Sequence, residues 1–174
     1  SLNNNCVYAL KKVELGQFED VSGFKGEIDL LTKLKSCERV VTLVDYATTE
    51  SSLYLIMEKG DLDLAEVLQY RLKLDAPLDL NFVKYHTIEM FKCIKDVHDA
   101  GIVHSDLKPA NFLFVRGMLK IIDFGIANAV PDHTINVYRE NQIGTPNYMA
   151  PEAICESNYT SARIWKVGKP SDIW

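Results

Sequence analysis

The stretch His104-Ser105-Asp106-Leu107-Lys108-Pro109-Ala110-Asn111 gathers a carboxylate, an ammonium group and an amide in one short segment. Asp123-Phe124-Gly125 follows twelve residues after Asn111, and Ala150-Pro151-Glu152 comes later. Each of these motifs alone occurs by chance in many proteins. Their order and spacing together are far more specific, and they indicate one shared site.

The composition is that of a folded globular chain. Its 174 residues are 47% hydrophobic and 25% charged, which allows a buried core. The net charge of -5, without a Lys/Arg cluster, argues against a nucleic-acid partner, because phosphate binding needs a concentrated basic patch. Apolar runs such as Leu53–Met57 are too short to span a bilayer, and the first residues lack a signal-peptide pattern. We therefore expect an intracellular protein without nucleic-acid or membrane partners.

The first part of the chain has a strand pattern followed by a helix pattern. Residues 6–13 alternate as a strand, which places Ala9 and Lys11 on the same face. Apolar residues then recur at helical spacing between positions 24 and 34, and Glu27 lies beside their stripe. The sequence thus predicts one strand and one amphipathic helix, each with a charged residue near its apolar face.

Two β-rich stretches, residues 39–47 and 52–58, come next, and the polar residues between them predict an antiparallel hairpin. Lys59-Gly60 ends this pattern. Helices are predicted over residues 62–72 and 80–100, the second with Val83, Met90, Ile94 and Val97 on its buried face and with Gly101 as its stop signal.

A tight hairpin is predicted after the second helix. Its strands are residues 112–115 and 118–122, and Arg116-Gly117 forms the turn. Beyond Asp123 the pattern dissolves into about thirty residues of mixed loop, and loops of such length are usually functional or disordered.

These elements predict an α+β fold with two lobes. Residues 1–58 form a small β-rich lobe with one helix, residues 59–62 form a hinge, and residues 63–174 form a larger, mainly helical lobe. The cleft between the two lobes is the natural ligand site.

The motifs resemble those of the protein kinase family, whose fold is bilobal in this way. Within that family, Gly101–Ile154, with His-Ser-Asp in place of the usual His-Arg-Asp, is similar to the monopolar-spindle, threonine-and-tyrosine kinase (TTK) family. The resemblance implies a partial kinase domain over residues 1–174, with an activation segment at residues 123–152. It also implies ATP-dependent phosphorylation of proteins, with ATP and Mg²⁺ as cofactors.

The resemblance assigns a nucleotide site to the first part of the chain. Lys11 would hold the α- and β-phosphates and Glu27 would orient it by ion pairing. Ala9 would line the same site, Met57 would be the gatekeeper, and the backbone from Glu58 to Gly60 would pair with adenine. Without the later motifs, Lys11 and Glu27 would be an ordinary surface lysine and helix glutamate, and Met57 ordinary core packing.

The resemblance also assigns the chemistry. Asp123 and Asn111 would be Mg²⁺ ligands through their oxygen atoms. Asp106 would accept the proton of the substrate hydroxyl, and Lys108 would neutralise the γ-phosphate. Lys108 together with Thr145 is the serine/threonine-kinase arrangement, although tyrosine specificity stays open. In the alternative, purely structural interpretation, Asp106 is a turn residue and Asn111 is a cap.

One position departs from the family pattern, because Ser105 stands where most kinases have an arginine that binds an activation-loop phosphate. Activation by phosphorylation would then use other basic residues or matter less. Thr134 occupies the approximate place of an autophosphorylation site in such kinases. Glu152 belongs to the same activation segment.

The chain lacks the Gly-rich phosphate loop that the family places before Lys11, and it stops at Trp174. We therefore expect a fragment of a domain of about 260 residues. By analogy, kinetochore or spindle-checkpoint proteins would be its partners, at the nucleus or spindle. The alternatives are a non-catalytic kinase-fold scaffold, an inactive fragment, or a serine/threonine kinase of another branch.

Overall fold

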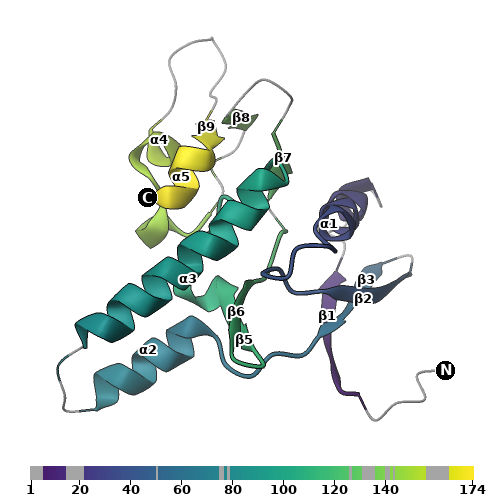
Figure 1. The fold of residues 1–174 in the computed structure, drawn as a ribbon. Coiled ribbons are helices and arrows are strands. Elements are labelled where there is room, and N and C mark those ends of the chain that lie inside the picture. The colour runs from purple at the N-terminus through teal and green to yellow at the C-terminus, as the bar shows by residue number, and fades with distance from the viewer. Residues whose placement is uncertain are drawn as a thin grey trace.

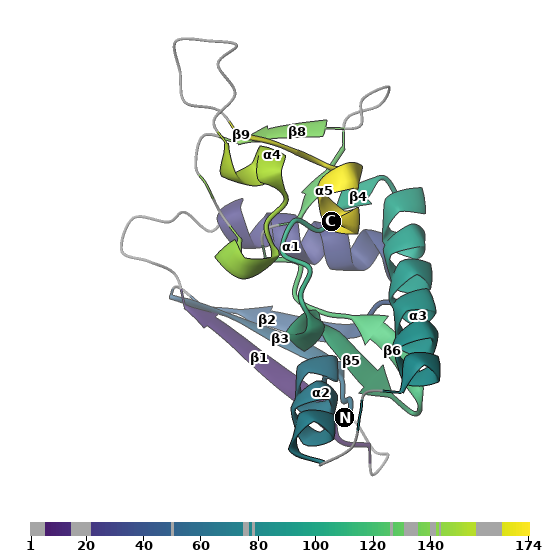
Figure 2. The same ribbon diagram turned by 90° about the vertical axis from the view of Figure 1, so that its left-hand side faces the viewer.

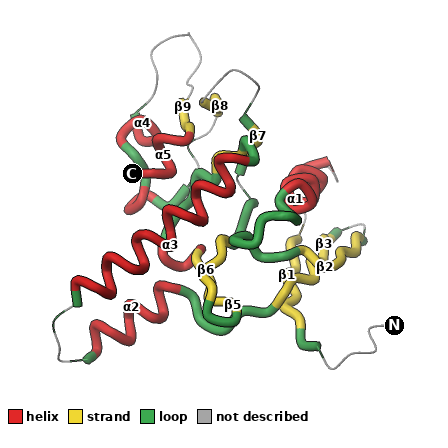
Figure 3. Tube along the Cα trace, in the orientation of Figure 1, coloured by secondary structure: helices red, strands yellow, loops and turns green. Residues whose placement is uncertain are grey.

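The computed structural model describes residues 6–14, 22–49, 51–74, 77, 79–125, 127–130, 136–139, 142, 144–155 and 165–174, with the side chains of residues 22–25, 128, 136, 138, 139 and 166 excepted. Figures 1 and 3 show the arrangement of its helices and strands. In chain order they are β1 (Tyr8–Glu14), α1 (Ser22–Lys33), β2 (Leu43–Thr48), β3 (Ser52–Glu58), α2 (Leu64–Lys73), α3 (Leu80–Asp99), β4 (Ile102–Val103), η1 (Pro109–Asn111), β5 (Phe112–Val115), β6 (Met118–Ile121), β7 (Asn128–Ala129), β8 (Asn136–Arg139), η2 (Pro146–Tyr148), α4 (Pro151–Ile154), β9 (Trp165–Gly168) and α5 (Lys169–Ile173). The predicted α+β fold is confirmed.

An antiparallel sheet in the order β1-β3-β2 forms the first part of the fold, with α1 on one side of it (Figure 2). Leu53 and Leu55 of the central strand are completely buried. In β1 the predicted alternation is present, because Lys11 is partly buried while Leu10 is 65% exposed. The sheet therefore directs the Lys11 side chain inward.

The predicted hairpin is present, but its first strand begins at Leu43 rather than at Arg39. The residues before it pair elsewhere: Val41 N–H donates to the Ile121 carbonyl at 3.0 Å, and Ile121 N–H donates to the Arg39 carbonyl at 2.9 Å. A β-rich pattern does not specify its pairing partner, so residues 39–41 look like the start of β2 although they lie against β6.

Helix α3 ends as predicted, with Gly101 at φ +71° just after its cap. Cys93, Ile94 and Val97 are its buried residues. The prediction for Val83 was wrong, because its side chain is 37% exposed. The helix contacts β4 and β6, its buried residues all lie in its C-terminal half, and Val83 lies in the first turn. Among the described residues, no helix combines the length and apolar character needed to cross a membrane.

The β5–β6 hairpin is confirmed, with Arg116 at φ +51° and Gly117 at φ +81°. Positive φ at both central residues is the turn type that matches the twist of the flanking strands. The long loop predicted after Asp123 is only partly a loop, because β7 pairs with β4 and β8 pairs with β9. Such short ladders carry too few residues to produce a readable alternation.

The segment 59–62, which connects the two parts of the fold, is hydrogen-bonded to β5. Asp61 N–H donates to the Phe114 carbonyl at 2.8 Å, and Phe114 N–H donates to the Leu62 carbonyl at 2.9 Å. Gly60 lies so close to this strand that a Cβ atom would be 2.3 Å from the Leu113 side chain. Glycine is therefore required here by close approach rather than by backbone angle.

The Gly60→Ala variant should lose about 1–3 kcal/mol of unfolding free energy, because the added methyl group overpacks against Leu113. Gly26→Ala is the matched control, since its Cβ would meet nothing within 4 Å. On helix propensity, that change should add about 0.5–1 kcal/mol. Urea unfolding of both variants measures the difference, and equal stability of the two would contradict the packing argument.

Candidate active site

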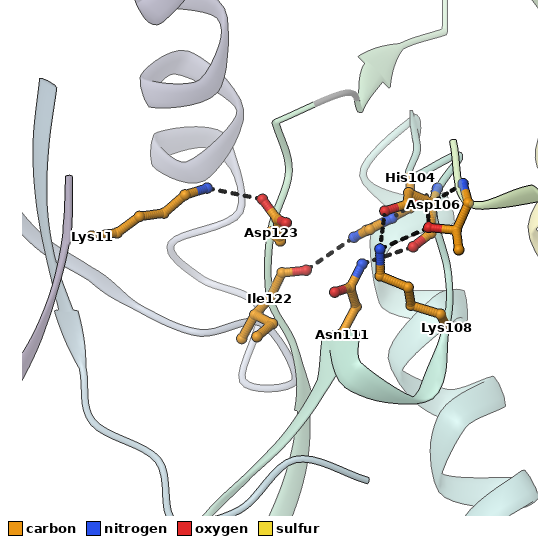
Figure 4. Close-up of polar contacts among 8 residues, drawn as sticks. Lys11, His104, Asp106, Lys108, Asn111, Ile122 and Asp123 are labelled. Atoms are coloured by element: carbon orange, nitrogen blue, oxygen red, sulfur yellow. Dashed lines mark hydrogen bonds and ion pairs between the residues drawn. The ribbon is translucent and has the colours of Figure 1, made fainter. Parts of the chain in front are cut away.

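The Lys11 ammonium joins three distant segments of the chain, and Figure 4 shows its contact with Asp123. Its Nζ lies 2.9 Å from Glu27 Oε1 and 2.8 Å from Asp123 Oδ1. Lys11 comes from β1, Glu27 from α1, and Asp123 follows β6. The structure thus brings together three of the residues that the sequence motifs single out.

The electrostatics of this group follow from its partial burial. Burial by itself would lower the pKa of Lys11, but the hydrogen bonds that Lys11 donates to Asp123 and Glu27 raise it above its ordinary value. Burial by itself would raise the pKa of Asp123, whereas the Lys11 ammonium holds it below its ordinary value. Lys11 and Asp123 are therefore both charged at neutral pH, as an ion pair of opposite charges.

The direction of the Asp123 side chain is set by an unusual backbone conformation. Asp123 has φ +65°, in the left-handed region that residues other than glycine rarely adopt. The next side chain, Phe124, is 1% exposed and packs with its ring 5.0 Å from the His104 ring. Burial of Phe124 therefore holds a conformation that costs on the order of 1–3 kcal/mol.

A second polar group forms around Asp106. Its Oδ2 lies 2.8 Å from Lys108 Nζ, and its Oδ1 accepts hydrogen bonds from the Thr145 hydroxyl at 2.6 Å and the Thr145 N–H at 2.8 Å. Lys108 also donates to the Thr145 hydroxyl at 2.7 Å. Burial opposes ionisation of Asp106, but Lys108 and Thr145 together keep its pKa below the ordinary value.

Asn111 is buried and has a fixed amide orientation. Its side-chain Nδ2 donates to the Asp106 backbone carbonyl at 2.7 Å, and its backbone carbonyl accepts from Ile122 N–H at 3.0 Å. Figure 4 shows the amide oxygen on the side that faces Asp123. The two residues thus present oxygen atoms toward the same region.

These oxygen atoms fit a magnesium site shared with a phosphate ligand. The described residues contain no cluster of three His, Cys, Asp or Glu that would hold a metal alone. Mg²⁺ usually takes only one or two carboxylates and fills its remaining positions with water and substrate phosphates. Asp123 and Asn111 supply such a donor set, and the excess negative charge around Lys11 favours a cation there.

His104 links the Asp106 loop to the strand end that carries Asp123. Its Nε2 donates to the Ile122 carbonyl at 3.0 Å, and its Nδ1 accepts from Asp106 N–H at 3.3 Å. The ring is buried, which lowers its pKa and keeps it neutral. Both nitrogens are used for positioning, a role that the sequence pattern does not assign to this residue.

Asp172 organises the backbone of the same loop from the far end of the chain. Its Oδ2 accepts from His104 N–H and from His98 Nε2, both at 2.8 Å, and its Oδ1 accepts from Ser105 N–H at 2.7 Å. Its side chain is 1% exposed. Ser105 has φ +71°, so this carboxylate stabilises a second left-handed residue next to Asp106.

Sequence reasoning missed the contacts of Asp172 and His98. Neither belongs to a motif with the loop residues, and 67 positions separate Asp172 from Ser105. The one available signal was an aspartate in an otherwise mostly apolar C-terminal stretch, and that signal is weak.

The residues assigned to adenine lie at one end of the β1-β3-β2 sheet. Ala9 and Met57 are direct partners across β1 and β3, and Met57 is partly buried against the core. The Glu58 side chain points away from this strand pair to Thr42. Gly60 lies against β5, as described above.

The activation-segment residues are only partly placed. Thr145 belongs to the Asp106 group, and Glu152 Oε1 accepts from the Ser171 hydroxyl at 2.8 Å. Thr134 lies outside the described residues, so its predicted phosphorylation stays a prediction.

Two pockets flank the site. One, of about 330 Å³, is lined by Asp106 and Thr145 together with apolar residues of α3 and α5. The other, of about 460 Å³, is lined by Glu27 and Phe124. Lys11 lines neither of these two pockets, and the Asp123 side chain beside it is 49% exposed.

The fold and the site together define a protein kinase domain. The protein kinase domain family model matches residues 1–174, and the chain belongs to this family. Within it, the chain is 60% identical to serine/threonine-protein kinase MPS1 of Saccharomyces cerevisiae, over 99% of this chain and 23% of that protein.

Two further relatives carry related names. The chain is 43% identical to serine/threonine-protein kinase mph1 of Schizosaccharomyces pombe, over 100% of this chain and 26% of the relative. It is 38% identical to dual specificity protein kinase TTK of Mus musculus, over 97% of this chain and 20% of the relative. The chain thus spans about a quarter or less of these proteins. The resemblance to the monopolar-spindle and TTK kinases is confirmed.

The Asp172→Ala variant should release the backbone of the Asp106 loop, because the His104 and Ser105 amides lose a buried acceptor. We expect both amides to exchange hydrogen at least about tenfold faster, which corresponds to about 1.4 kcal/mol. Asp99→Ala, which removes a largely exposed carboxylate paired with Lys95 within α3, is the control and should leave these amides unchanged. Unaltered exchange in Asp172→Ala would contradict the assigned role.

The stability contributed by Asp106 should depend on pH. Its pKa is lower in the folded state than the ordinary 3.8, so its contribution is fully present above that value and is lost as the pH falls through the folded-state pKa. Asp106→Asn should therefore be less stable than wild type at neutral pH, and the gap should narrow in acid. Urea unfolding from neutral to acidic pH measures the difference in unfolding free energy, with Asp29→Asn at an exposed position as the control. A difference between wild type and Asp106→Asn that stays constant with pH would contradict this prediction.

Proposed function

We propose that the protein containing this chain transfers the γ-phosphoryl group of ATP to serine and threonine hydroxyls of other proteins, with Mg²⁺ as cofactor. One observation carries the proposal: the Lys11 ammonium lies within 3 Å of both Glu27 and Asp123. Phosphoryl transfer passes through a loose transition state with dispersed negative charge, so its catalysis depends mainly on positioned cations. The family membership of the chain supports the same reaction.

Each residue of the site has a task in this reaction. Lys11, held by Glu27, binds the α- and β-phosphates. Asp123 and Asn111 hold Mg²⁺, which supplies charge neutralisation on the phosphates when it is bound. These contacts orient the nucleotide before any bond changes.

The transfer itself takes place beside Asp106. Its carboxylate accepts the proton of the substrate hydroxyl, whose oxygen bonds to the γ-phosphorus as the bond to the β-phosphate oxygen breaks and ADP departs. Lys108 neutralises the γ-phosphate during this step. Because Asp106 is ionised well below neutral pH, it can accept that proton throughout the physiological range.

The class of substrate is argued from Lys108 and Thr145, which contact each other and Asp106. This arrangement favours serine and threonine, and the name of the mouse relative extends the proposal to tyrosine as a secondary acceptor. By the resemblance to the monopolar-spindle family, we place its substrates among kinetochore and spindle-checkpoint proteins, with action at the nucleus or spindle in mitosis.

A pair of adjacent lysines tests the proposal. In the full-length protein, Lys11→Met should lower kcat/KM for phosphate transfer from labelled ATP by about 10²–10³-fold, the effect of removing one preorganised charge. Lys12→Met is the matched control, since Lys12 pairs only with the exposed Glu14 in the described part of the chain, and should change it by less than about twofold.

Asp106→Asn separates catalysis from binding. It should lower kcat by about 10²–10⁴-fold, as loss of a general base does, while nucleotide binding is retained. A wild-type protein that binds nucleotide but transfers no phosphate would instead indicate the non-catalytic scaffold.

A further inference from the structure

The Glu58 carboxylate has a set of partners that the site described above does not use. Its Oε1 accepts from Thr42 N–H at 2.7 Å, from the Thr42 hydroxyl at 3.0 Å and from Lys120 Nζ at 2.6 Å. Thr42 lies just before β2, Glu58 ends β3 and Lys120 lies in β6. Three segments that are distant in sequence therefore meet at one carboxylate.

This contact is more than a surface ion pair. The side chains of Lys120 and Glu58 are 13% and 24% exposed, so solvent screens their attraction only weakly. Burial alone would raise the pKa of Glu58, but Lys120 and Thr42 hold it below its ordinary value. The group is thus an ionised carboxylate with directed donors, which is the stronger class of hydrogen bond.

The contact links the segment assigned to adenine to the strand that precedes Asp123. Glu58 is the first residue of the segment Glu58–Gly60, whose backbone is assigned to adenine, and Lys120 lies three residues before Asp123. The backbone beside it is also tied across the two parts of the fold, since Val41 and Arg39 bond to Ile121. The backbone bonds bring residues 39–41 and β6 together. The Glu58–Lys120 contact adds a restraint on the orientation of the end of β3 relative to β6.

The conformation that the contact holds is one suited to nucleotide binding. In the same structure, Lys11 reaches both Glu27 and Asp123, and Phe124 is buried. A contact that ties the end of β3 to β6 therefore keeps the adenine segment at a fixed distance from the magnesium ligand. A nucleotide that must reach both ends gains from that preorganisation.

We infer that Thr42, Glu58 and Lys120 form a clamp that positions the adenine-binding backbone relative to Asp123 and so increases the affinity for Mg·ATP. This inference rests on the proposed function, because it names positioning residues for the same site. Thr42 and Lys120 are positioning residues that touch neither nucleotide nor substrate, and the Glu58 carboxylate acts through the Glu58 backbone, which is assigned to adenine.

Lys120→Ala in the full-length protein tests the clamp. We expect the KM for ATP and the dissociation constant of Mg·ADP to rise together by about fivefold or more, the low end of typical coupling between sites, with kcat changed by less than about twofold. Lys120→Arg, which keeps a cationic donor, should recover most of the affinity. Lys95→Ala, which removes an exposed lysine paired with Asp99 within α3, is the matched control and should leave both constants unchanged.

Thr42→Val keeps the size of the side chain and removes only the hydroxyl donor. It should raise the same two constants by about twofold, in line with one lost hydrogen bond. Combined with Lys120→Ala it should be non-additive, because both donors bind one carboxylate. Because Thr42→Val is nearly isosteric, its effect on nucleotide affinity tests the clamp even where Lys120→Ala impairs folding.

Three outcomes would overturn the clamp: unchanged nucleotide constants in both variants, a loss that Lys120→Arg does not recover, or a rise in kcat with tighter nucleotide binding, which would make the contact a restraint. Failure of the proposed function is distinguishable from these. A wild-type protein that binds Mg·ADP without transferring phosphate removes the kinase proposal and leaves the binding test of the clamp intact. A wild-type protein that does not bind nucleotide overturns both.

Discussion

The buried carboxylate of Asp172 is the constraint on which the site depends. A carboxyl group out of water is costly unless hydrogen-bond partners surround it, and here His98, His104 and Ser105 supply three. Two of those donors are backbone amides of the loop that carries Asp106. The carboxylate therefore holds Ser105 in a left-handed conformation that a serine would not keep by itself, and Asp106 points toward Lys108 and Thr145 as a result.

Strain and charge are concentrated in the same small region. Asp123 and Ser105 both have positive φ, and Ser105 is the residue before Asp106. His104 joins the two, since one ring nitrogen binds the Asp106 amide and the other binds the Ile122 carbonyl. Packing of Phe124 on that ring couples the strand end that carries Asp123 to the Asp106 loop. Electrostatic catalysis of phosphoryl transfer, the proposed reaction, depends on charged groups positioned in this way.

Strand β6 connects this region to the rest of the fold. It pairs with β5 through the Arg116-Gly117 turn, bonds to the segment before β2 through Ile121, and carries Lys120 toward Glu58. The turn was predictable, because two residues with positive φ are needed there and Gly117 signals it. The bond to Ile121 was not predictable, and residues 39–41 looked like the start of a strand whose true partner lies elsewhere.

The sequence by itself determined the alternation of β1, the helices α2 and α3 to within a few residues, the β5–β6 turn and the motifs that contain Lys11, Asp106 and Asp123, because local periodicity and motif spacing are properties of neighbouring residues. Only the tertiary structure decided that Asp172 would hold the Asp106 loop, that Glu58 would meet Lys120, and that Val83 would be exposed. Those outcomes depend on which distant segments meet. The hydrogen-bond partners of a buried polar group are set by the tertiary fold and leave no pattern along the chain.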